Sequence, residues 1–191
     1  MRIDIKQIVE KVFEESNSKL IMEDYLIREG TGFTKAVEHL SYSHSGISTS
    51  RYYVASMFMG KMEEEEGLNI LKALQTLQIQ MEDHPKCGGF YVFREEIGHP
   101  LAQPGVNAAA FILQPLIILY LMKPELIPES NKVVMERMFS YGVKWFSKVC
   151  KETTLYYPNN IRYILQGSKN VSYTEDELLV YKEIKPSLKN I

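Results

Sequence analysis

The chain has 191 residues, a formal net charge of −2 and two cysteines, Cys87 and Cys150. We expect one domain over residues 1–191, with a composition typical of globular proteins. The near-neutral charge disfavours a general nucleic-acid binder, which carries a basic stripe, and two cysteines are too few for a disulfide scaffold. The first 13 residues mix charges with apolar side chains and show no secretory signal, so we expect a cytoplasmic protein.

The first quarter of the chain predicts short helices separated by polar loops. Residues 4–15 carry apolar side chains at i, i+3, i+4, i+7 and i+8, which is the pattern of an amphipathic helix. Further helical turns are expected over residues 20–28, and a short helix over residues 34–40. Residues 41–50 are rich in Ser, Gly and Thr, which predicts an irregular loop that carries His44.

The middle of the chain predicts two more helices and the one strand of the fold. Ser50 opens the first of these helices, and the second spans residues 68–82. Between them lie four consecutive glutamates, residues 63–66, whose side chains point in different directions on a helix; this favours a solvated surface over a metal site. Residues 90–93 are aromatic and β-branched and predict a short strand. Because no pair of histidines has the spacing of a zinc motif, we expect neither a metal nor a cofactor.

Residues 104–123 are the most apolar segment and predict the central helix of the fold. Almost every side chain from 111 to 122 is apolar, which is typical of a helix buried on nearly all sides. Asn107 is the expected N-cap, and Pro115 should kink the helix or loosen the turn before it. Asn107, Gln114 and Pro115 interrupt the apolar run, and no second such segment accompanies it. A buried core helix is therefore favoured over a membrane span.

The last third of the chain predicts one long helix and a shorter one. Val134, Met138, Tyr141, Trp145 and Val149 repeat with helical spacing and form one buried face. A capping box, Thr174 with Glu177, opens a later helix. The repeated order of helix, loop and helix predicts an all-α fold of antiparallel helical hairpins, with at most one short strand or hairpin.

Four segments in chain order carry a family resemblance: Arg51-Tyr52-Tyr53, LQTLQIQMEDHP, GGFYVF and VNAAAFILQPLIILYL. Together they resemble the N-terminal half of the six-hairpin α/α-toroid proteins, which include glycosidases of the unsaturated-uronyl type and heparinase-like polysaccharide lyases. In that family an Asp-x-Asn feature precedes a very apolar helix. Here Asn107 matches the asparagine, and Gly105 stands at the position of the acid. The turn Tyr157-Pro158-Asn159-Asn160-Ile161 resembles the Tyr-x-Asn-Ile turn that begins a later helix.

The resemblance implies a partial α/α toroid and a carbohydrate-active protein. A hairpin of two helices with its loops takes about 45 residues, so the chain holds about four hairpins rather than six. Helices that face the missing hairpins would expose apolar surface. We therefore expect an open ring or self-association into a homo-oligomer.

The candidate site residues lie mainly in the connections between helices. His99 and Glu96 are the catalytic candidates, because an imidazole or a carboxylate suits proton transfer near neutral pH; the alternative for His99 is an exposed loop histidine. Aromatic faces and amide groups suit the C–H faces and hydroxyls of sugar rings, whereas ordinary packing is the alternative for each residue. The substrate-binding candidates are Tyr53, Phe90, Tyr91, Asn107, Tyr156 and Asn159.

Two functions remain open at the level of the sequence. One is a carbohydrate-active protein that hydrolyses or eliminates acidic oligosaccharides, or a truncated relative that only binds them. The other is a non-catalytic helical scaffold or protein-interaction module. A carboxylate that converges with a second carboxylate, a histidine or a tyrosine on one cavity would favour the first, and Glu95, Glu96, His99 and Asp83 lie in suitable loops. We expect a saccharide ligand and neither a nucleic-acid nor a membrane partner.

Overall fold

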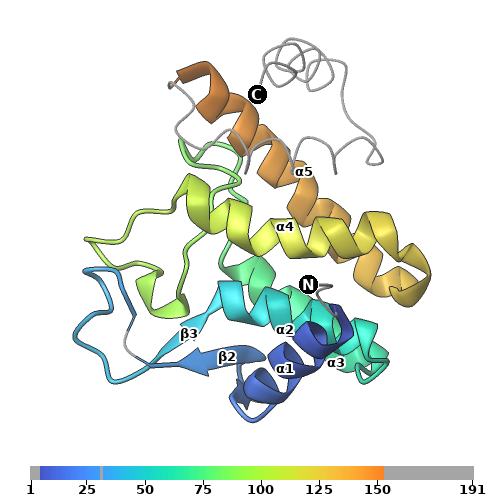
Figure 1. Ribbon diagram of the computed structural model, residues 1–191. Coiled ribbons are helices and arrows are strands. Elements are labelled where there is room, and N and C mark those ends of the chain that lie inside the picture. The colour runs from blue at the N-terminus through green and yellow to red at the C-terminus, as the bar shows by residue number, and fades with distance from the viewer. Residues whose placement is uncertain (1–4, 31, 153–191) are drawn as a thin grey trace.

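A computed structural model describes residues 5–30 and 32–152 of the chain. This part is predominantly helical, which confirms the helical class, and it adds a small three-stranded sheet (Figure 1). In chain order its elements are α1 (Ile5–Asn17), β1 (Leu20–Ile21), β2 (Leu26–Glu29), β3 (Ser43–Ser45), α2 (Gly46–Phe58), α3 (Glu64–Thr76), the 3-10 helix η1 (Arg94–Glu96), α4 (Val106–Met122), the 3-10 helix η2 (Pro124–Leu126) and α5 (Glu129–Glu152). The single domain expected over residues 1–191 extends past these ranges and stays a prediction.

The four central helices form two hairpins that lie side by side. The first hairpin is α2 with α3, and the second is α4 with α5. Across the hairpins α2 packs on α4 and α3 packs on α5, so the first helices of both hairpins make one layer and the second helices make another. Figure 1 shows α2 and α4 running in the same direction, with α1 alongside α2. The connections before α2 and before α4 therefore meet at one end of the pair.

The sheet replaces elements that the sequence predicted differently. β1, β2 and β3 pair antiparallel in that order, with Ile27 opposite Ser45. The prediction of helical turns over residues 20–28 is therefore wrong. The prediction of at most one short strand or hairpin in the fold is also wrong. Leu26 and Ile27 are buried, and the Ile27 amide donates to Thr49 Oγ1 at 2.8 Å, so tertiary contacts decide the strand conformation. Residues 34–40 form hydrogen-bonded turns rather than a helix, and residues 43–45 belong to β3 rather than to a loop.

Several helix and strand boundaries also differ from expectation. The helix expected over residues 68–82 is α3, which begins at Glu64 and ends at Thr76; its first turn holds three glutamates, where the helix dipole favours negative charge. Residues 90–93 form isolated bridges rather than a strand, because Phe90 pairs with Gln78 and Gly105. The N-cap of α4 is Gly105, and Asn107 is an exposed residue of its first turn, so the predicted capping role of Asn107 is wrong.

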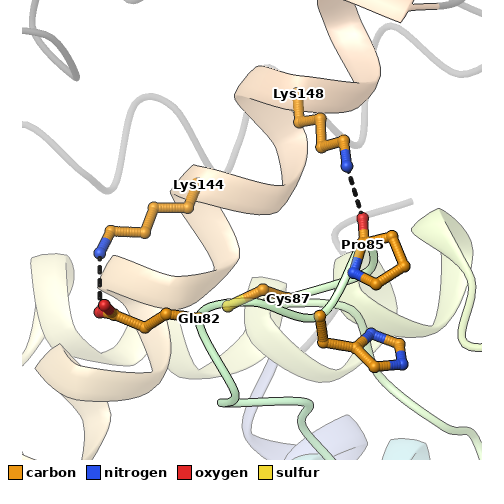
Figure 2. Close-up of a pocket in the computed structure, with 6 residues that line it drawn as sticks. Glu82, Pro85, Cys87, Lys144 and Lys148 are labelled. Carbon is orange, nitrogen blue, oxygen red and sulfur yellow. Dashed lines mark hydrogen bonds and ion pairs between the residues drawn. The ribbon is translucent and has the colours of Figure 1, made fainter.

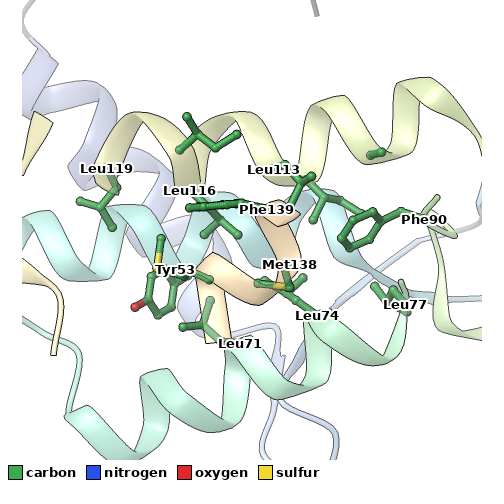
Figure 3. Packing of buried hydrophobic residues seen from close by; sticks show 14 of the residues in the cluster. Tyr53, Leu71, Leu74, Leu77, Phe90, Leu113, Leu116, Leu119, Met138 and Phe139 are labelled. Carbon is green, nitrogen blue, oxygen red and sulfur yellow. The ribbon is translucent and has the colours of Figure 1, made fainter. Parts of the chain in front are cut away.

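The main core surrounds α4, as expected for the most apolar segment. Figure 3 shows Leu113, Leu116 and Leu119 of α4 packed toward Tyr53 of α2 and Phe139 of α5. Burial is nonetheless one-sided. A stripe of apolar side chains on α4 stays exposed, namely Phe111 at 40%, Ile118 at 43% and Met122 at 69%. The expectation of a helix buried on nearly all sides is therefore wrong on this face. No helix in the described ranges has both the length and the hydropathy needed to cross a bilayer.

Candidate functional site

Three of the predicted site residues lie inside the fold. Tyr53 and Phe90 are fully buried, and the Tyr53 hydroxyl accepts a hydrogen bond from Asn131 Nδ2 at 3.1 Å. Glu96 is only 3% exposed, and its carboxylate accepts hydrogen bonds from the Val92 and Phe93 amides and from the Thr34 hydroxyl. Their predicted roles in catalysis or sugar binding stay predictions, and these roles would require the side chains to leave the interior.

The remaining predicted residues of the described ranges lie nearer the surface. His99 is half-buried, and its Nδ1 accepts a hydrogen bond from the Leu101 amide at 3.2 Å, which fixes the ring within its own turn. Tyr91 is half-buried, and Asn107 is exposed on α4. Tyr156 and Asn159 lie outside the described residues, so their predicted contacts stay predictions.

The structure joins a carboxylate and a histidine that the sequence analysis left unpaired. Glu95 of η1 accepts two hydrogen bonds from His44 of β3, one from the backbone amide at 3.0 Å and one from ring Nδ1 at 2.5 Å. Asp24 Oδ2 lies 3.7 Å from His44 Nε2, and Asp24 also forms an ion pair with Arg94. His44 is only 8% exposed, and its ring is held in a fixed orientation between the two carboxylates. This Asp24–His44–Glu95 network locks the connection before α2 to the connection before α4.

Beside this network an open hollow lies at the N-terminal ends of α2 and α4. We call it the α2–α4 hollow; its volume is about 320 Å³. Two partly exposed aromatic rings, a guanidinium, a carboxylate and hydroxyl groups come together in it. Its lining residues are Glu29, Phe33, Ser45, Ile47, Ser48, Arg51 and Phe111.

The polar side of the α2–α4 hollow is organised by the first turn of α2. Ser45 is the N-cap, and its hydroxyl accepts the Ser48 amide at 3.2 Å, which satisfies a free donor of the helix. The Ser48 hydroxyl in turn donates to Glu29 Oε1, so strand β2 and helix α2 share one hydrogen-bonded group. On the apolar side Phe33 is 74% exposed and contacts Phe93 edge-on. The hollow can therefore offer both ring faces and hydrogen-bonding groups to a ligand.

Arg51 also lines a second surface, which is apolar rather than polar. The α1–α2–α4 groove has a volume of about 170 Å³ and an almost entirely apolar lining. Its residues are Ile8, Val9, Val12, Arg51, Val54, Ala55, Phe58 and Pro115. Phe111 and Ile118 of the exposed α4 stripe lie one helical turn to either side of Pro115, so the apolar surface extends past the groove.

Local sequence signals explain which of these residues were found. Glu95 was a candidate because it lies in the connection before α4, but its partner His44 is 51 residues away and no spacing rule links them. Phe33 and Glu29 were missed because they lie at the edges of the segments expected to be helical, residues 20–28 and 34–40, where no motif marked them. Among residues 5–30 and 32–152 no group of three or more His, Cys, Asp or Glu side chains has an arrangement that could hold a metal ion. Comparison with protein-family models, with curated proteins and with solved structures finds no match to this chain.

Proposed function

We propose that the protein binds an acidic saccharide in the α2–α4 hollow. The observation that carries the proposal is the combination of two accessible aromatic rings, Phe33 and Phe111, with Arg51 and the Glu29–Ser48 pair in one open cavity. Sugar rings present C–H faces that pack on aromatic rings and hydroxyls that need hydrogen-bond partners. Arg51 adds a charge for the ligand, because a guanidinium can bind a uronic carboxylate through two parallel hydrogen bonds.

Binding rather than catalysis is the proposed activity of this hollow. Glycoside hydrolysis generally uses a pair of carboxyl groups on either side of the scissile bond. Among the residues that line the hollow, Glu29 is the one carboxylate, and it already accepts a hydrogen bond from Ser48. The buried His44–Glu95 pair lies outside the lining, so in our proposal it holds the two connections in place.

The arrangement of the helices supports a partial α/α toroid as the framework of this site. In such a toroid successive hairpins stand side by side, with their first helices in one layer and their second helices in another. The contacts of α2 with α4 and of α3 with α5 follow this order. The connections before the first helices then meet at one end, and the α2–α4 hollow lies at that end.

The test is a titration of the full chain with uronic-acid-containing oligosaccharides, followed by calorimetry and by amide chemical shifts of residues 45–51. We expect saturable binding that neutral oligosaccharides of the same length do not reproduce. Arg51→Gln should weaken binding about tenfold, the effect of one lost charge-assisted contact. The matched control is Arg137→Gln, which removes an exposed arginine of α5 outside the hollow. Equal binding by acidic and neutral ligands, or equal effects of both variants, would refute the proposal.

The second candidate function is protein interaction through the α1–α2–α4 groove, with a second copy of the chain as the partner. The observation that favours it is the apolar lining of the groove, which continues into the exposed Phe111 and Ile118. Light scattering over a wide concentration range tests it. A dimer that dissociates in Phe58→Glu, but not in Val133→Glu on exposed α5 surface, would support this function. A monomer at every concentration would rule out the second copy of the chain as the partner.

The cytoplasmic location expected from the sequence stays a prediction.

A further inference from the structure

We propose that the α2–α4 hollow and the α1–α2–α4 groove form one continuous track, which binds an acidic saccharide that carries an alkyl chain. This inference rests on the proposed function, because it keeps the saccharide in the hollow and adds the chain in the groove. Arg51 lines both cavities, so the two meet at this residue. Their volumes are about 320 Å³ for the hollow and about 170 Å³ for the groove.

One face of α2 runs along the whole track. Ile47 and Ser48 line the hollow, Val54 and Phe58 line the groove, and Arg51 lies at the junction. Successive positions in this set are three or four residues apart along the track, which places them on one side of the helix. From the junction to the end of α2 the helix rises about 10 Å, since each residue adds about 1.5 Å. The groove is therefore about as long as an extended hexyl to octyl chain.

α4 supplies a second stripe along the same track. Phe111 lines the hollow, and Pro115, one helical turn further along, lines the groove. Ile118 and Met122 continue this face of α4 and are exposed. α2 and α4 run in the same direction and pack on each other (Figure 1), so both stripes lead from the hollow into the groove.

The chemistry of the track changes at Arg51. On the hollow side the Ser48 hydroxyl and the Glu29 carboxylate form a hydrogen-bonded pair that suits sugar hydroxyls. Beyond Arg51 all lining residues of the groove have apolar side chains. Such a lining stabilises a hydrocarbon chain, whereas a sugar ring there would bury hydroxyls without partners. A track with one polar and one apolar end therefore fits an amphiphile better than a longer saccharide.

Helix α1 forms the remaining wall of the groove. Its lining residues are Ile8, Val9 and Val12. α1 is fastened to α2, because the Phe13 ring stacks on Tyr52 and the Tyr52 hydroxyl donates to Asn17 Oδ1 at 2.9 Å. An apolar cavity of about 150 Å³ holds one benzene ring, so the groove has room for about six carbon atoms. The length and the volume of the groove thus agree on a single short alkyl chain.

The experiment titrates the full chain with methyl, butyl, hexyl and octyl glucuronide and measures each affinity by calorimetry. A fully buried methylene strengthens binding about fourfold; because the groove is open on one side, we expect about twofold per methylene. Hexyl glucuronide should then bind about thirtyfold more tightly than methyl glucuronide. If uronic-acid oligosaccharides bind but affinity does not rise with chain length, this inference is overturned and the proposed function stands.

Octyl glucoside provides the comparison for the head group, because it has the same chain without the carboxylate. We expect it to bind more weakly than octyl glucuronide. Equal affinities would show that the chain alone is bound, which would refute the acidic saccharide of the proposed function and this inference with it.

Variants separate the two parts of the track. Phe58→Ala should lower the ratio of octyl to methyl glucuronide affinity about fivefold, because it removes one wall of the groove. Phe33→Ala should weaken both ligands by the same factor, because Phe33 lines the hollow and not the groove. The matched control Val133→Ala removes an exposed side chain of α5 outside both cavities and should change neither affinity. Equal ratios in Phe58→Ala and Val133→Ala would overturn the inference.

A second copy of the chain is the competing occupant of the groove. Light scattering with and without saturating octyl glucuronide distinguishes the two. Octyl glucuronide should dissociate any dimer that Phe58→Glu dissociates. A dimer that the variant dissociates and the ligand does not would assign the groove to the second copy and overturn the inference.

Cys87 provides a control for the integrity of the fold. It is half-buried in a separate cavity between the loop after α3 and helix α5, where Glu82 and Lys144 also lie (Figure 2). This cavity shares no lining residue with the track. The alkylation rate of Cys87, measured by mass spectrometry of its peptide, should stay constant during the octyl glucuronide titration. Faster alkylation would mean that the amphiphile unfolds the protein, and it would overturn the assignment of the chain to the groove.

Discussion

Replacing Leu116 by Ala should destabilise the protein by about 4 kcal/mol. Leu116 is 0% exposed and lies at the centre of α4, where it packs toward α2 and α5 (Figure 3). The change removes three carbon atoms from the core, which at about 0.8 kcal/mol per buried methylene costs about 2.4 kcal/mol. A cavity of about 70 Å³ that stays open adds about 1.7 kcal/mol, at about 24 cal/mol per Å³. The sum lies inside the range of about 2.7–5 kcal/mol seen for buried leucines.

The matched control for this prediction lies on the same helix. Ile118 is 43% exposed, so Ile118→Ala removes a side chain that is already partly in water and should cost under about 1 kcal/mol. Urea titration followed by circular dichroism measures both free energies of unfolding. A loss below about 1 kcal/mol at Leu116 would show that α4 lies at the periphery of the core. Equal losses at both positions would contradict the difference in burial between the two faces of α4.

Three further predictions follow from single contacts. Glu96→Ala should lower the free energy of unfolding by about 2–5 kcal/mol, because it leaves two backbone amides and one hydroxyl without their acceptor; urea titration measures the loss, and a change under 1 kcal/mol would contradict it. Gly88→Ala should unfold the protein or shift its melting temperature strongly, whereas Gly60→Ala, which has a similar positive φ but open space around it, should cost only about 1 kcal/mol. Burial raises the pKa of Tyr53 from 10.0 to about 12, so the folded state holds this proton more tightly than the unfolded state. The resulting stability is fully present below pH 10 and is lost between about pH 10 and 12, by about 3 kcal/mol in total, and Tyr53→Phe should flatten this alkaline slope.

The helices were predictable where apolar side chains repeat with one period over many residues. α1 and the central helix α4 were found because their patterns need no information from the rest of the chain. The sheet was missed because the apolar pairs Leu20-Ile21 and Leu26-Ile27 fit a helix face as well as a hairpin. What decides between the two is the pairing of Ile27 with Ser45, and this contact joins residues that are distant in the sequence.

The candidate site was predictable only in part, for the same reason. The sequence placed aromatic and charged residues in the connections before α2 and α4, and these connections do meet. It did not show which side chains point inward. Phe90 and Tyr53 are core residues. Phe33, which directly precedes the helix expected over residues 34–40, is instead 74% exposed in the α2–α4 hollow. The direction of each side chain depends on tertiary packing that periodicity does not contain.

Glu95 and Glu96 show how two adjacent carboxylates take different roles. They belong to η1, a 3-10 helix with three residues per turn, so neighbouring side chains point about 120° apart. Glu96 turns inward and binds the Thr34 hydroxyl, beside Phe33 of the hollow. Glu95 turns toward β3 and binds His44, next to the N-cap Ser45 that shapes the first turn of α2. One turn of η1 thus positions both the aromatic and the polar wall of the α2–α4 hollow, although neither carboxylate lines it. Glu96, a catalytic candidate at the level of the sequence, and its neighbour Glu95 thus hold the walls of the hollow in place in the described structure.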